Sequence, residues 1–424
     1  MDDGASLLQP YRVLDLTEGG LNFAGKLLAD LGADVIRVEP PFGSATRCRG
    51  PFYHDQVHPE RSLFWFAFNV NKRGITLDPG TADGAAIFRG LLQSADILLE
   101  SCPQTMMKCG LDTQSLRELN PCLVHVSVTP FGRNGPYEGY RSNDLITWAL
   151  SGYLYVCGEP RRPPVRISVP VSEQIAGGCA AAAAMHALWY RNRTGLGQRA
   201  EVSQLSAAVW ANSMLHGYGV TNTPMQRQGA YRTQGRLKFQ ELFRCRDGYV
   251  TCFLMQGHWG APFNQQLVAW MQENDMATAE LIDLDWSRWL PTTMVRDDDP
   301  ASITSAERQA LMVEEPVAAF LLTKTKSEIF QRALAHSLQI GPVMDVKDIS
   351  EWPHLKERGF WQPVDHPELS SRLLYPGPFA RFSETPVTYR RRPPMIGEHN
   401  RELYGESLGY TDEHLRALRE AGAI

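Results

Sequence analysis

The feature that most constrains the fold is one pattern repeated through the first 130 residues, a short apolar run followed by an amphipathic segment. The apolar runs have the length of buried strands, and they occupy 11–17 (YRVLDLT), 34–39 (DVIRVE), 96–100 (DILLE) and 123–129 (LVHVSVT), with a shorter extended piece at 74–78. Helices are predicted between them at 23–31, at 82–94 and, as a helix end, at 115–120. Strands that alternate with helices pair in parallel through right-handed crossovers, so the sequence predicts an α/β fold.

The pattern changes after a loop rich in Pro and Arg at 158–165 (GEPRRPPV). A long helix is predicted at 172–191, and a second helix from 198 to about 218. The segments that follow are less regular, and the Pro-rich tail from 339 is expected to pack back on the first domain. We therefore predict a large domain made of residues 1–220 and 338–424 and a small domain at 221–337.

The composition is that of a folded protein without a polyanionic partner. Of the 424 residues, 43% are hydrophobic and 21% are charged, which is far from the pattern of disordered chains. The net charge of -5 gives no reason to expect nucleic acid as a partner. The most apolar stretch, 176–190, ends at Arg191 and is shorter than the roughly 20 residues of a membrane span. The N-terminal sequence MDDGASLLQP is acidic and lacks an apolar signal region, so a cytoplasmic location is expected.

Three further patterns carry little specific information. The eight cysteines include no C-x-x-C, and no His pair has helical ligand spacing, so neither a disulfide framework nor a metal site is predicted. Gly20–Lys26 (GLNFAGK) has P-loop spacing, but Leu27 stands where a hydroxyl would hold magnesium, which favours a glycine turn before a helix. Gly405–Gly409 (GESLG) has the spacing of a nucleophile elbow, but a predicted helix precedes it, which favours a helix C-terminal turn.

One group of cations is a candidate for binding phosphate. Asn71, Lys72 and Arg73 occupy a polar turn between two apolar runs. The turn is either an ordinary solvated turn or a phosphate clamp, to which Arg37 and Lys108 would add charge.

A carboxylate at the start of the apolar helix is a candidate for catalysis. Ser172 is the predicted N-cap of this helix, and Glu173 in its first turn is favoured by the helix dipole. Gly177 and Gly178 leave little side-chain bulk one turn further on, and the amides of the helix N-terminus can stabilise charge on an adduct. Glu173 is therefore either a residue that stabilises the helix or a nucleophilic carboxylate.

Several longer segments lie in a recognisable order along nearly the whole chain. They are YRVLDLT with LLADLGADVIRVEPP, NVNKRGITLD, SADILLE with LRELNPCLVHVSVTPFGRNGPY, RTGLGQRAEVS, RCRDGYV, and IGPV, HLKERGF, FSETP and GEHN in the tail. In these segments the chain resembles the class III CoA-transferase family. That family includes the formyl-CoA, carnitine and benzylsuccinate CoA-transferases and, by fold, the α-methylacyl-CoA racemases.

The resemblance implies a Rossmann-like large domain whose parallel sheet is formed by both termini, a smaller middle domain, and an interlocked dimer of two subunits threaded through each other. It implies an enzyme that moves CoA from an acyl-CoA to a free carboxylic acid, with CoA and acyl-CoA as substrates and no tightly bound cofactor. In this family an Asp attacks the thioester and then holds CoA as an aspartyl thioester. That position falls on Glu173, whose extra methylene displaces the carboxylate by roughly 1.5 Å. The candidate CoA contacts are Arg37, Asn71, Lys72, Arg73 and Lys108.

The chain departs from the family pattern at three places. The run Glu-Asn-Phe-x-Pro-Gly, which lines the CoA cleft of the family, is replaced by the shorter Glu100–Gln104 (ESCPQ). The Gln or similar polar side chain that often follows the first strand is replaced by Gly20. The His of the racemases falls on Asn143, beside Asp144, so racemisation is not expected.

These departures leave three roles open. In the first, Glu173 is the nucleophile of a homodimer. In the second, the chain is the non-catalytic subunit of a heterodimer whose paralogous partner supplies the Asp, as in the two-subunit arrangement associated with benzylsuccinate CoA-transferase. In the third, the chain binds CoA thioesters without catalysis. None of the three involves nucleic acid, a membrane or a metal.

Overall fold

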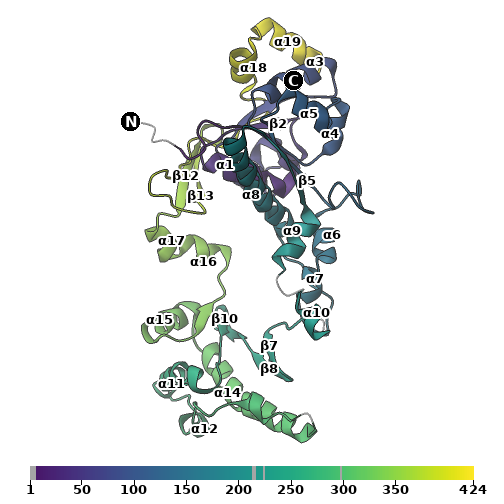
Figure 1. Cartoon of the computed structure of the whole chain (residues 1–424). Coiled ribbons are helices and arrows are strands. Elements are labelled where there is room, and N and C mark those ends of the chain that lie inside the picture. The colour runs from purple at the N-terminus through teal and green to yellow at the C-terminus, as the bar shows by residue number, and fades with distance from the viewer. Residues whose placement is uncertain (1–5, 213–215, 223–224, 297) are drawn as a thin grey trace. The chain divides into compact units, whose positions relative to one another are not determined.

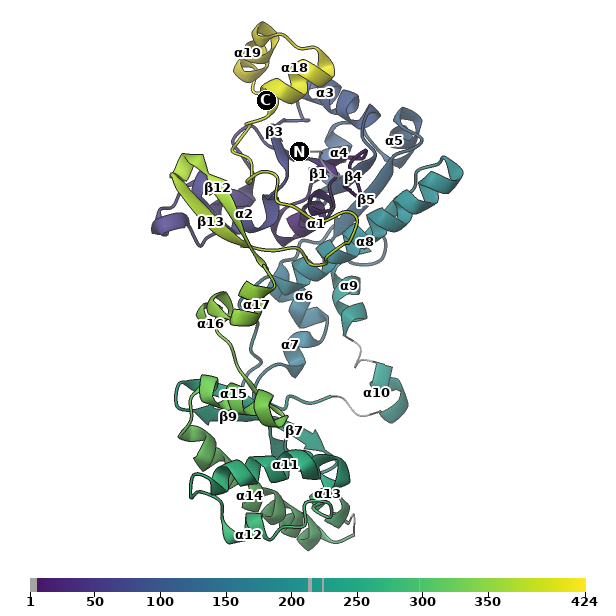
Figure 2. The ribbon, with the colours of Figure 1, turned by 90° about the vertical axis from the view of Figure 1, so that its left-hand side faces the viewer.

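The computed structural model describes residues 6–212, 216–222, 225–296 and 298–424 (Figure 1, Figure 2). These residues form two compact units. The first contains Met1–Leu154, Arg166–Thr223 and His354–Ile424, and the second contains Tyr155–Val165 and Pro224–Pro353. Both ends of the chain thus belong to the first unit. Residues 155–165 and 338–353 belong to the second unit, whereas the sequence-based bounds place them in the large domain.

A six-stranded parallel sheet forms the centre of the first unit. Its strands are β1 (Arg12–Leu16), β2 (Asp34–Glu39), β3 (Arg73–Thr76), β4 (Ile97–Glu100), β5 (Val124–Thr129) and β6 (Arg199–Ser203). They lie in the order β3-β2-β1-β4-β5-β6, and every neighbouring pair is parallel. This is the strand order of a Rossmann fold, so the predicted α/β class is confirmed. All six strands come from residues 12–203, so the expectation that both termini form the sheet is wrong. The C-terminal part contributes helices and a two-stranded hairpin to the unit because its strands pair with each other and not with the sheet.

Successive residues of a strand point to opposite faces of the sheet. Both faces of this sheet carry apolar side chains, and helices cover both. On one face, α1 (Phe23–Asp30) and α8 (Val171–Thr194) pack on Val13, Ile97 and Val126. The α8 side chains buried in this core are mostly small, namely Ala176, Ala180, Ala184 and Ala187, with Leu188 near the end of the helix. On the other face, Leu14, Ile36 and Leu98 pack with α3 (Ala82–Gln93), α5 (Thr113–Leu119), α18 (Asn400–Leu408) and α19 (Asp412–Glu420). Figure 2 shows α18 and α19 next to α3.

The sequence prediction is wrong for residues 199–203, which it placed at the start of a helix. They form the edge strand β6, in register with β5 from His125↔Arg199 to Thr129↔Ser203. Pairing with a buried strand outweighs the helical preference of a short segment such as RAEVS. The helix α9 (Gln204–Ala211) begins only after Ser203, whose side chain caps it. Residues 213–215 of the predicted helix lie outside the described residues.

The other elements of the first unit are α2 (Leu63–Asn69), α4 (Pro103–Lys108), α6 (Asp144–Leu150), α10 (His216–Thr221) and the hairpin of β12 (Trp361–His366) and β13 (Ser371–Pro376). The short helix α7 (Tyr153–Val156) contains the boundary between the two units, which falls after Leu154. The helix α17 (Pro353–Glu357) joins the two units along the chain. The helix α18 ends at Gly409, which has a φ of 71°, so the predicted C-terminal turn of the GESLG segment is confirmed.

The second unit has its own core. It contains the antiparallel sheet β11 (Ile340–Pro342), β10 (Gly248–Cys252) and β9 (Leu242–Cys245), and the hairpin β7 (Tyr231–Gln234) and β8 (Leu237–Gln240). Its helices are α11 (Gly257–Gln272), α12 (Ala279–Ile282), α13 (Pro291–Met294), α14 (Pro300–Leu322), α15 (Lys326–His336) and α16 (Val346–Glu351). Three tryptophans, Trp270, Trp286 and Trp289, are buried in this core. The unit can therefore bury its apolar surface without the parallel sheet.

Two kinds of feature are absent from the described part of the chain. None of the helices there combines the length and the apolar character that crossing a bilayer requires. No three His, Cys, Asp or Glu side chains in that part gather in a way that would hold a metal ion.

Candidate active site

The candidate site lies beyond the carboxyl end of β1, where the strand order of the sheet reverses. β1 is flanked by β2 on one side and by β4 on the other. In open α/β sheets the crevice at such a reversal is the usual place for a ligand. The chain leaves β1 through Thr17 and Glu18 into the short 3-10 helix η1 (Gly19–Asn22), against which α8 packs.

Glu173, in the first turn of α8, directs its carboxylate at the backbone of η1. The Gly20 N–H donates to Glu173 Oε2 at 2.7 Å, and Arg49 Nη1 lies 3.2 Å from the same oxygen. Within the described residues, Oε1 has no hydrogen-bonding partner. One oxygen is thus held by two donors while the other is unengaged, and the Glu173 side chain is 12% exposed. This arrangement suits a carboxylate that reacts through Oε1.

Two consecutive glycines make room for this carboxylate. A Cβ on Gly20 would lie 2.8 Å from Glu173 Cβ and 2.9 Å from Oε2. A Cβ on Gly19, where φ is +63°, would lie 2.8 Å from Arg49 Nη1 and 2.9 Å from Glu173 Oε2. A side chain at position 20 would therefore meet both Cβ and Oε2 of Glu173. The Cβ contact would exist with Asp as well, whereas Oε2 reaches this position through the longer side chain of Glu.

The start of α8 differs from the sequence prediction. Its N-cap is Pro170, not Ser172, and the side chain of Pro170 makes no capping hydrogen bond. The Ser172 backbone N–H and hydroxyl both donate to Asp144 Oδ1, at 2.9 and 2.6 Å. The two glycines of α8 have different surroundings. Gly177 packs on Phe23, while a Cβ on Gly178 would meet open space. Glu173 is thus positioned by Asp144 through its neighbour Ser172 and by Gly20 directly.

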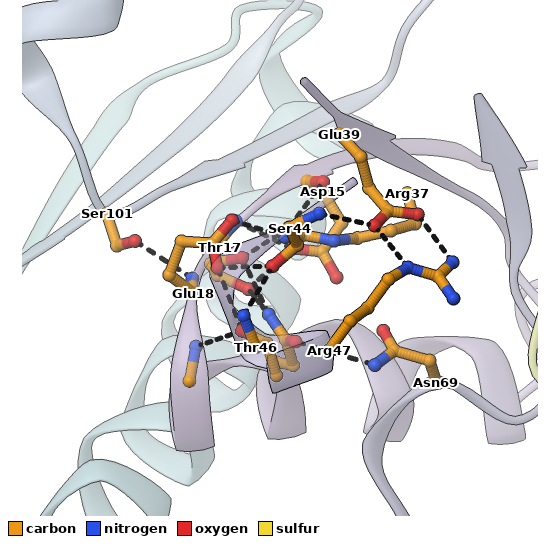
Figure 3. A network of polar contacts seen from close by, with 12 residues as sticks. Asp15, Thr17, Glu18, Arg37, Glu39, Ser44, Thr46, Arg47, Asn69 and Ser101 are labelled. Carbon is orange, nitrogen blue, oxygen red and sulfur yellow. Dashed lines mark hydrogen bonds and ion pairs between the residues drawn. The ribbon is translucent and has the colours of Figure 1, made fainter. Parts of the chain in front are cut away.

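A polar network holds the turn between β1 and η1 in place (Figure 3). Glu18 is its centre, since Oε1 accepts from Arg37 Nη2 at 2.6 Å and Oε2 accepts from the hydroxyls of Ser44 and Thr46 at 2.5 and 2.8 Å. Arg37 is fully buried and also lies 3.8 Å from Asp15 Oδ1. Burial lowers the pKa of the Arg37 guanidinium, but the carboxylates around it outweigh burial and leave that pKa raised. Arg37 therefore supports the turn from inside the protein.

Two hydroxyls fix the backbone of the same turn. Thr46 Oγ1 accepts from the Gly19 N–H at 2.9 Å, and Ser101 Oγ accepts from the Glu18 N–H at 3.0 Å (Figure 3). Ser101 follows β4, so its bond spans the two strands between which the order reverses. With these amides engaged, the Gly20 N–H is the amide of the turn that meets Glu173.

The family of the chain follows from its similarity to known proteins. The model of CoA-transferase family III matches residues 8–400. The chain belongs to CoA-transferase family III. The resemblance seen in the sequence segments is thereby confirmed, and the family is one of enzymes.

Relatives of this family III chain are similar over nearly their full length. The chain is 32% identical to succinyl-CoA:(R)-benzylsuccinate CoA-transferase subunit BbsE of Thauera aromatica, covering 98% of this chain and 97% of that protein. It is 28% identical to succinate–glutarate CoA-transferase of Agrobacterium fabrum, covering 91% of each. A CAIB/BAIF family protein from Brucella suis has a similar fold, with a TM-score of 0.79 and 24% identity over 96% of this chain and 100% of that one.

The five predicted CoA contacts of the family III chain do not form one open cluster, although Arg37 and Lys72 both pair with the buried Asp15. Lys72 is fully buried with its Nζ 2.8 Å from Asp15 Oδ2, and Asn71 donates to Asp30 Oδ1 at 2.9 Å. Arg73 is ion-paired with Asp34 at 2.5 Å and with Glu402 at 2.6 Å. Lys108, at the end of α4, is exposed. Arg37 is engaged as well, so of these five residues Lys108 is the one whose side chain is exposed, and the phosphate clamp stays a prediction.

The C-terminal segment explains why the turn at 71–73 is not an open anion site. Asn71 Nδ2 donates to the Thr388 carbonyl, and Asn71 Oδ1 accepts from the Arg390 N–H at 2.7 Å. The segment continues past Gly74, where an added Cβ would lie 2.8 Å from Pro394. The C-terminal segment, more than 300 residues away in sequence, therefore covers the turn at 71–73.

The buried pair of Lys72 and Asp15 leads to a prediction about stability. Burial, opposed by Asp15, lowers the pKa of Lys72 to about 8, while the pKa of Asp15 is lowered because its cations outweigh burial. Lys72→Met is expected to lower the free energy of unfolding by about 3–5 kcal/mol, because it removes the nearest cation from a buried carboxylate. Urea unfolding followed by circular dichroism measures the change. Lys108→Met is the matched control, with an expected change within about 0.5 kcal/mol. Equal stability of the two variants would contradict a structural role for Lys72.

Two parts of the site could not be predicted from the sequence. Arg49 lies in a Gly- and Arg-rich segment, 124 residues before Glu173 in the chain, and no spacing links the two. The network around Glu18 was also not predicted. The signal that was available is the pair Gly19-Gly20 directly after the first strand, which marks a close approach of another segment to the backbone.

Proposed function

We propose that this chain transfers CoA from an acyl-CoA to a free carboxylic acid and that Glu173 is the nucleophile. The observation that carries the proposal is the carboxylate of Glu173, with Oε2 bound to the Gly20 N–H and Oε1 unengaged. Gly20 supports the same conclusion, because the lack of a side chain there leaves room for Oε2 of Glu173 beside the amide.

The proposed reaction begins with attack of Glu173 Oε1 on the carbonyl carbon of the acyl-CoA. An O–C bond forms, the C–S bond breaks, and CoA leaves as its thiolate, which gives a mixed anhydride. The thiolate then attacks the side-chain carbonyl carbon of Glu173, and the acid leaves as a free carboxylate. The Glu173 thioester that remains transfers CoA to the second acid by the same steps in reverse.

The Gly20 N–H has a specific role in these steps. After acylation of Oε1, Oε2 becomes the carbonyl oxygen of Glu173, and attack on this carbonyl places a negative charge on Oε2. The Gly20 amide, 2.7 Å from Oε2, is positioned to stabilise that charge. Removal of one such donor from an oxyanion site costs about 10²–10³ in kcat in other acyl-transfer enzymes. The amide is held in place by the turn that Glu18, Thr46 and Ser101 support.

An isotope exchange tests this proposal. Several relatives have succinyl-CoA in their names, so succinyl-CoA is the first donor to test. With a covalent Glu173 thioester, labelled succinate is expected to enter succinyl-CoA in the absence of a second acid. Transfer that occurs only with both acids present, without this exchange, would contradict the covalent mechanism.

A second candidate is the non-catalytic subunit of a two-subunit enzyme. It is favoured by the printed names of two relatives, subunit BbsE of the benzylsuccinate enzyme and the beta subunit of a succinyl-CoA–L-malate CoA-transferase from Chloroflexus aurantiacus. In this case a paralogous partner with Asp at the position of Glu173 performs the chemistry. Exchange activity of the chain on its own separates the two candidates, because a non-catalytic subunit would show none.

We also propose that the chain forms a dimer, as the family resemblance implies. Native mass spectrometry of the chain alone and of the chain expressed with a paralogue is the test. The homodimer proposal predicts a dimer from the first preparation, and the two-subunit candidate predicts preferential mixed dimers from the second. A monodisperse monomer in both preparations would contradict both.

A further inference from the structure

Arg49 differs from the other arginines near the site in being fixed in position but open to solvent. Its carbonyl accepts from Ser62 Oγ at 2.5 Å, and its guanidinium lies 4.9 Å from the centre of the Phe64 ring. Its side chain is 43% exposed, whereas those of Arg37 and Arg47 are 0% and 1% exposed. Arg49 is therefore a positioned cation at the surface of the site.

Most of the hydrogen-bonding capacity of Arg49 is unused. A guanidinium has five N–H donors, and the Arg49 side chain makes one hydrogen bond within the described residues, from Nη1 to Glu173 Oε2. Arg47 is the contrast, because its three nitrogens bond to Glu39, Glu60 and the Pro394 carbonyl. Arg49 thus keeps donors free for a second oxyanion beside Glu173.

We infer that Arg49 binds the carboxylate of the acid that enters and leaves during CoA transfer. The inference rests on the proposed function, in which Glu173 alternates between a free carboxylate and a thioester. In the resting protein, the carboxylate of Glu173 is the anion that pairs with Arg49. In the thioester the carbonyl of Glu173 is neutral, so Arg49 loses this charge partner. The free acid is present at that stage, and its carboxylate takes the place of the one that was lost.

The charges balance through the whole exchange. The entering carboxylate attacks the Glu173 thioester, the C–S bond breaks, and CoA leaves as its thiolate with a mixed anhydride remaining. The thiolate then attacks the carbonyl carbon of the acid, and Glu173 leaves as a carboxylate with the new acyl-CoA formed. One carboxylate is consumed and one is regenerated, and Arg49 pairs with each in turn. No further reactant is required.

The test measures discharge of the preformed Glu173 thioester. The protein is loaded with succinyl-CoA and desalted, and the thioester is then discharged either with succinate or with hydroxylamine, a neutral nucleophile. Arg49→Gln is expected to slow discharge by subsaturating succinate about 10- to 100-fold, the effect of losing a charge-assisted contact. Discharge by hydroxylamine is expected to change less than about twofold, because it needs no carboxylate recognition.

Two further variants sharpen the result. Arg401→Gln removes an exposed arginine that is paired with Asp412, away from the site, and it is expected to behave as the unchanged protein. Arg49→Lys keeps the charge, so it is expected to load normally and to discharge faster with succinate than Arg49→Gln. Arg49→Lys also serves for the comparison if Arg49→Gln does not load.

The outcomes separate this inference from the proposed function. No thioester on Glu173 in the unchanged protein would overturn both. A thioester that succinate discharges equally fast in the unchanged protein and the Arg49 variants would overturn only the role of Arg49. Equal slowing of succinate and hydroxylamine would also overturn it, because Arg49 would then act on the Glu173 carbonyl rather than on the acid.

Discussion

Replacement of Glu173 by Gln is expected to abolish CoA transfer, with a loss in kcat on the order of 10⁴ or more, as found when other enzymes lose a covalent nucleophile. The amide has nearly the shape of the carboxylate and can still accept from the Gly20 N–H, so the fold around η1 should be kept. It carries no negative charge and is a poor nucleophile, so attack on the thioester stops. The substitution should therefore lower kcat and leave the thermal stability unchanged.

Steady-state transfer from succinyl-CoA, with thermal unfolding measured in parallel, checks this expectation. Glu118→Gln is the matched control, because Glu118 is an exposed carboxylate on α5 that contacts Gln114. It is expected to leave both activity and stability unchanged. Full activity of Glu173→Gln in the chain alone would exclude Glu173 as the nucleophile.

The second large effect is expected from a side chain at position 20. Gly20→Gln places a Cβ at 2.8 Å from Glu173 Cβ, so the carboxylate has to move. A misplacement of about 1 Å costs about 100-fold in rate, and Glu173→Asp alone should cost a similar factor because its carboxylate is withdrawn by one carbon–carbon bond. The contacts that block a side chain at Gly20 come from Glu173 and, at 3.6 Å, from Pro170.

Glu173→Asp withdraws the carboxylate from Gly20 but keeps Cβ, so the double variant Gly20→Gln, Glu173→Asp is expected to recover part of the activity that each single change loses. A double-mutant cycle on kcat/KM measures the coupling between the two positions. Gly178→Ala is the control, since its Cβ would meet nothing within 4 Å. Losses that simply multiply in the double variant would show that the two positions do not compensate each other.

The large unit could be predicted well from the sequence where the information is local. The strand at 34–39 was predicted with the bounds of β2, and the predicted helix at 82–94 coincides with α3 to within one residue. These segments combine the apolar run or the amphipathic period with clear ends. The position of Glu173 at the start of a long apolar helix was predictable for the same reason.

The features that were missed depend on contacts between distant parts of the chain. The strand β6 forms because residues 199–203 pair with β5, which would otherwise be the edge strand of the sheet. The turn at 71–73 is covered by residues that are more than 300 positions away, and so its cations, which look free in the sequence, have partners. Arg49 and Glu173 meet only because η2 (Ala45–Cys48) and α8 both flank the end of β1. No local pattern records such contacts.

The measurement that tests the central claim most directly is the identification of the residue that carries CoA. The chain alone is incubated with succinyl-CoA and treated with hydroxylamine, which converts a carboxyl thioester into a stable hydroxamate, and the peptides are mapped by mass spectrometry. A nucleophilic Glu173 predicts a hydroxamate on Glu173 in the chain alone and its absence from Glu173→Gln. A hydroxamate found only on an Asp of a paralogous partner, with Glu173 unmodified, would contradict the claim and make this chain the non-catalytic subunit.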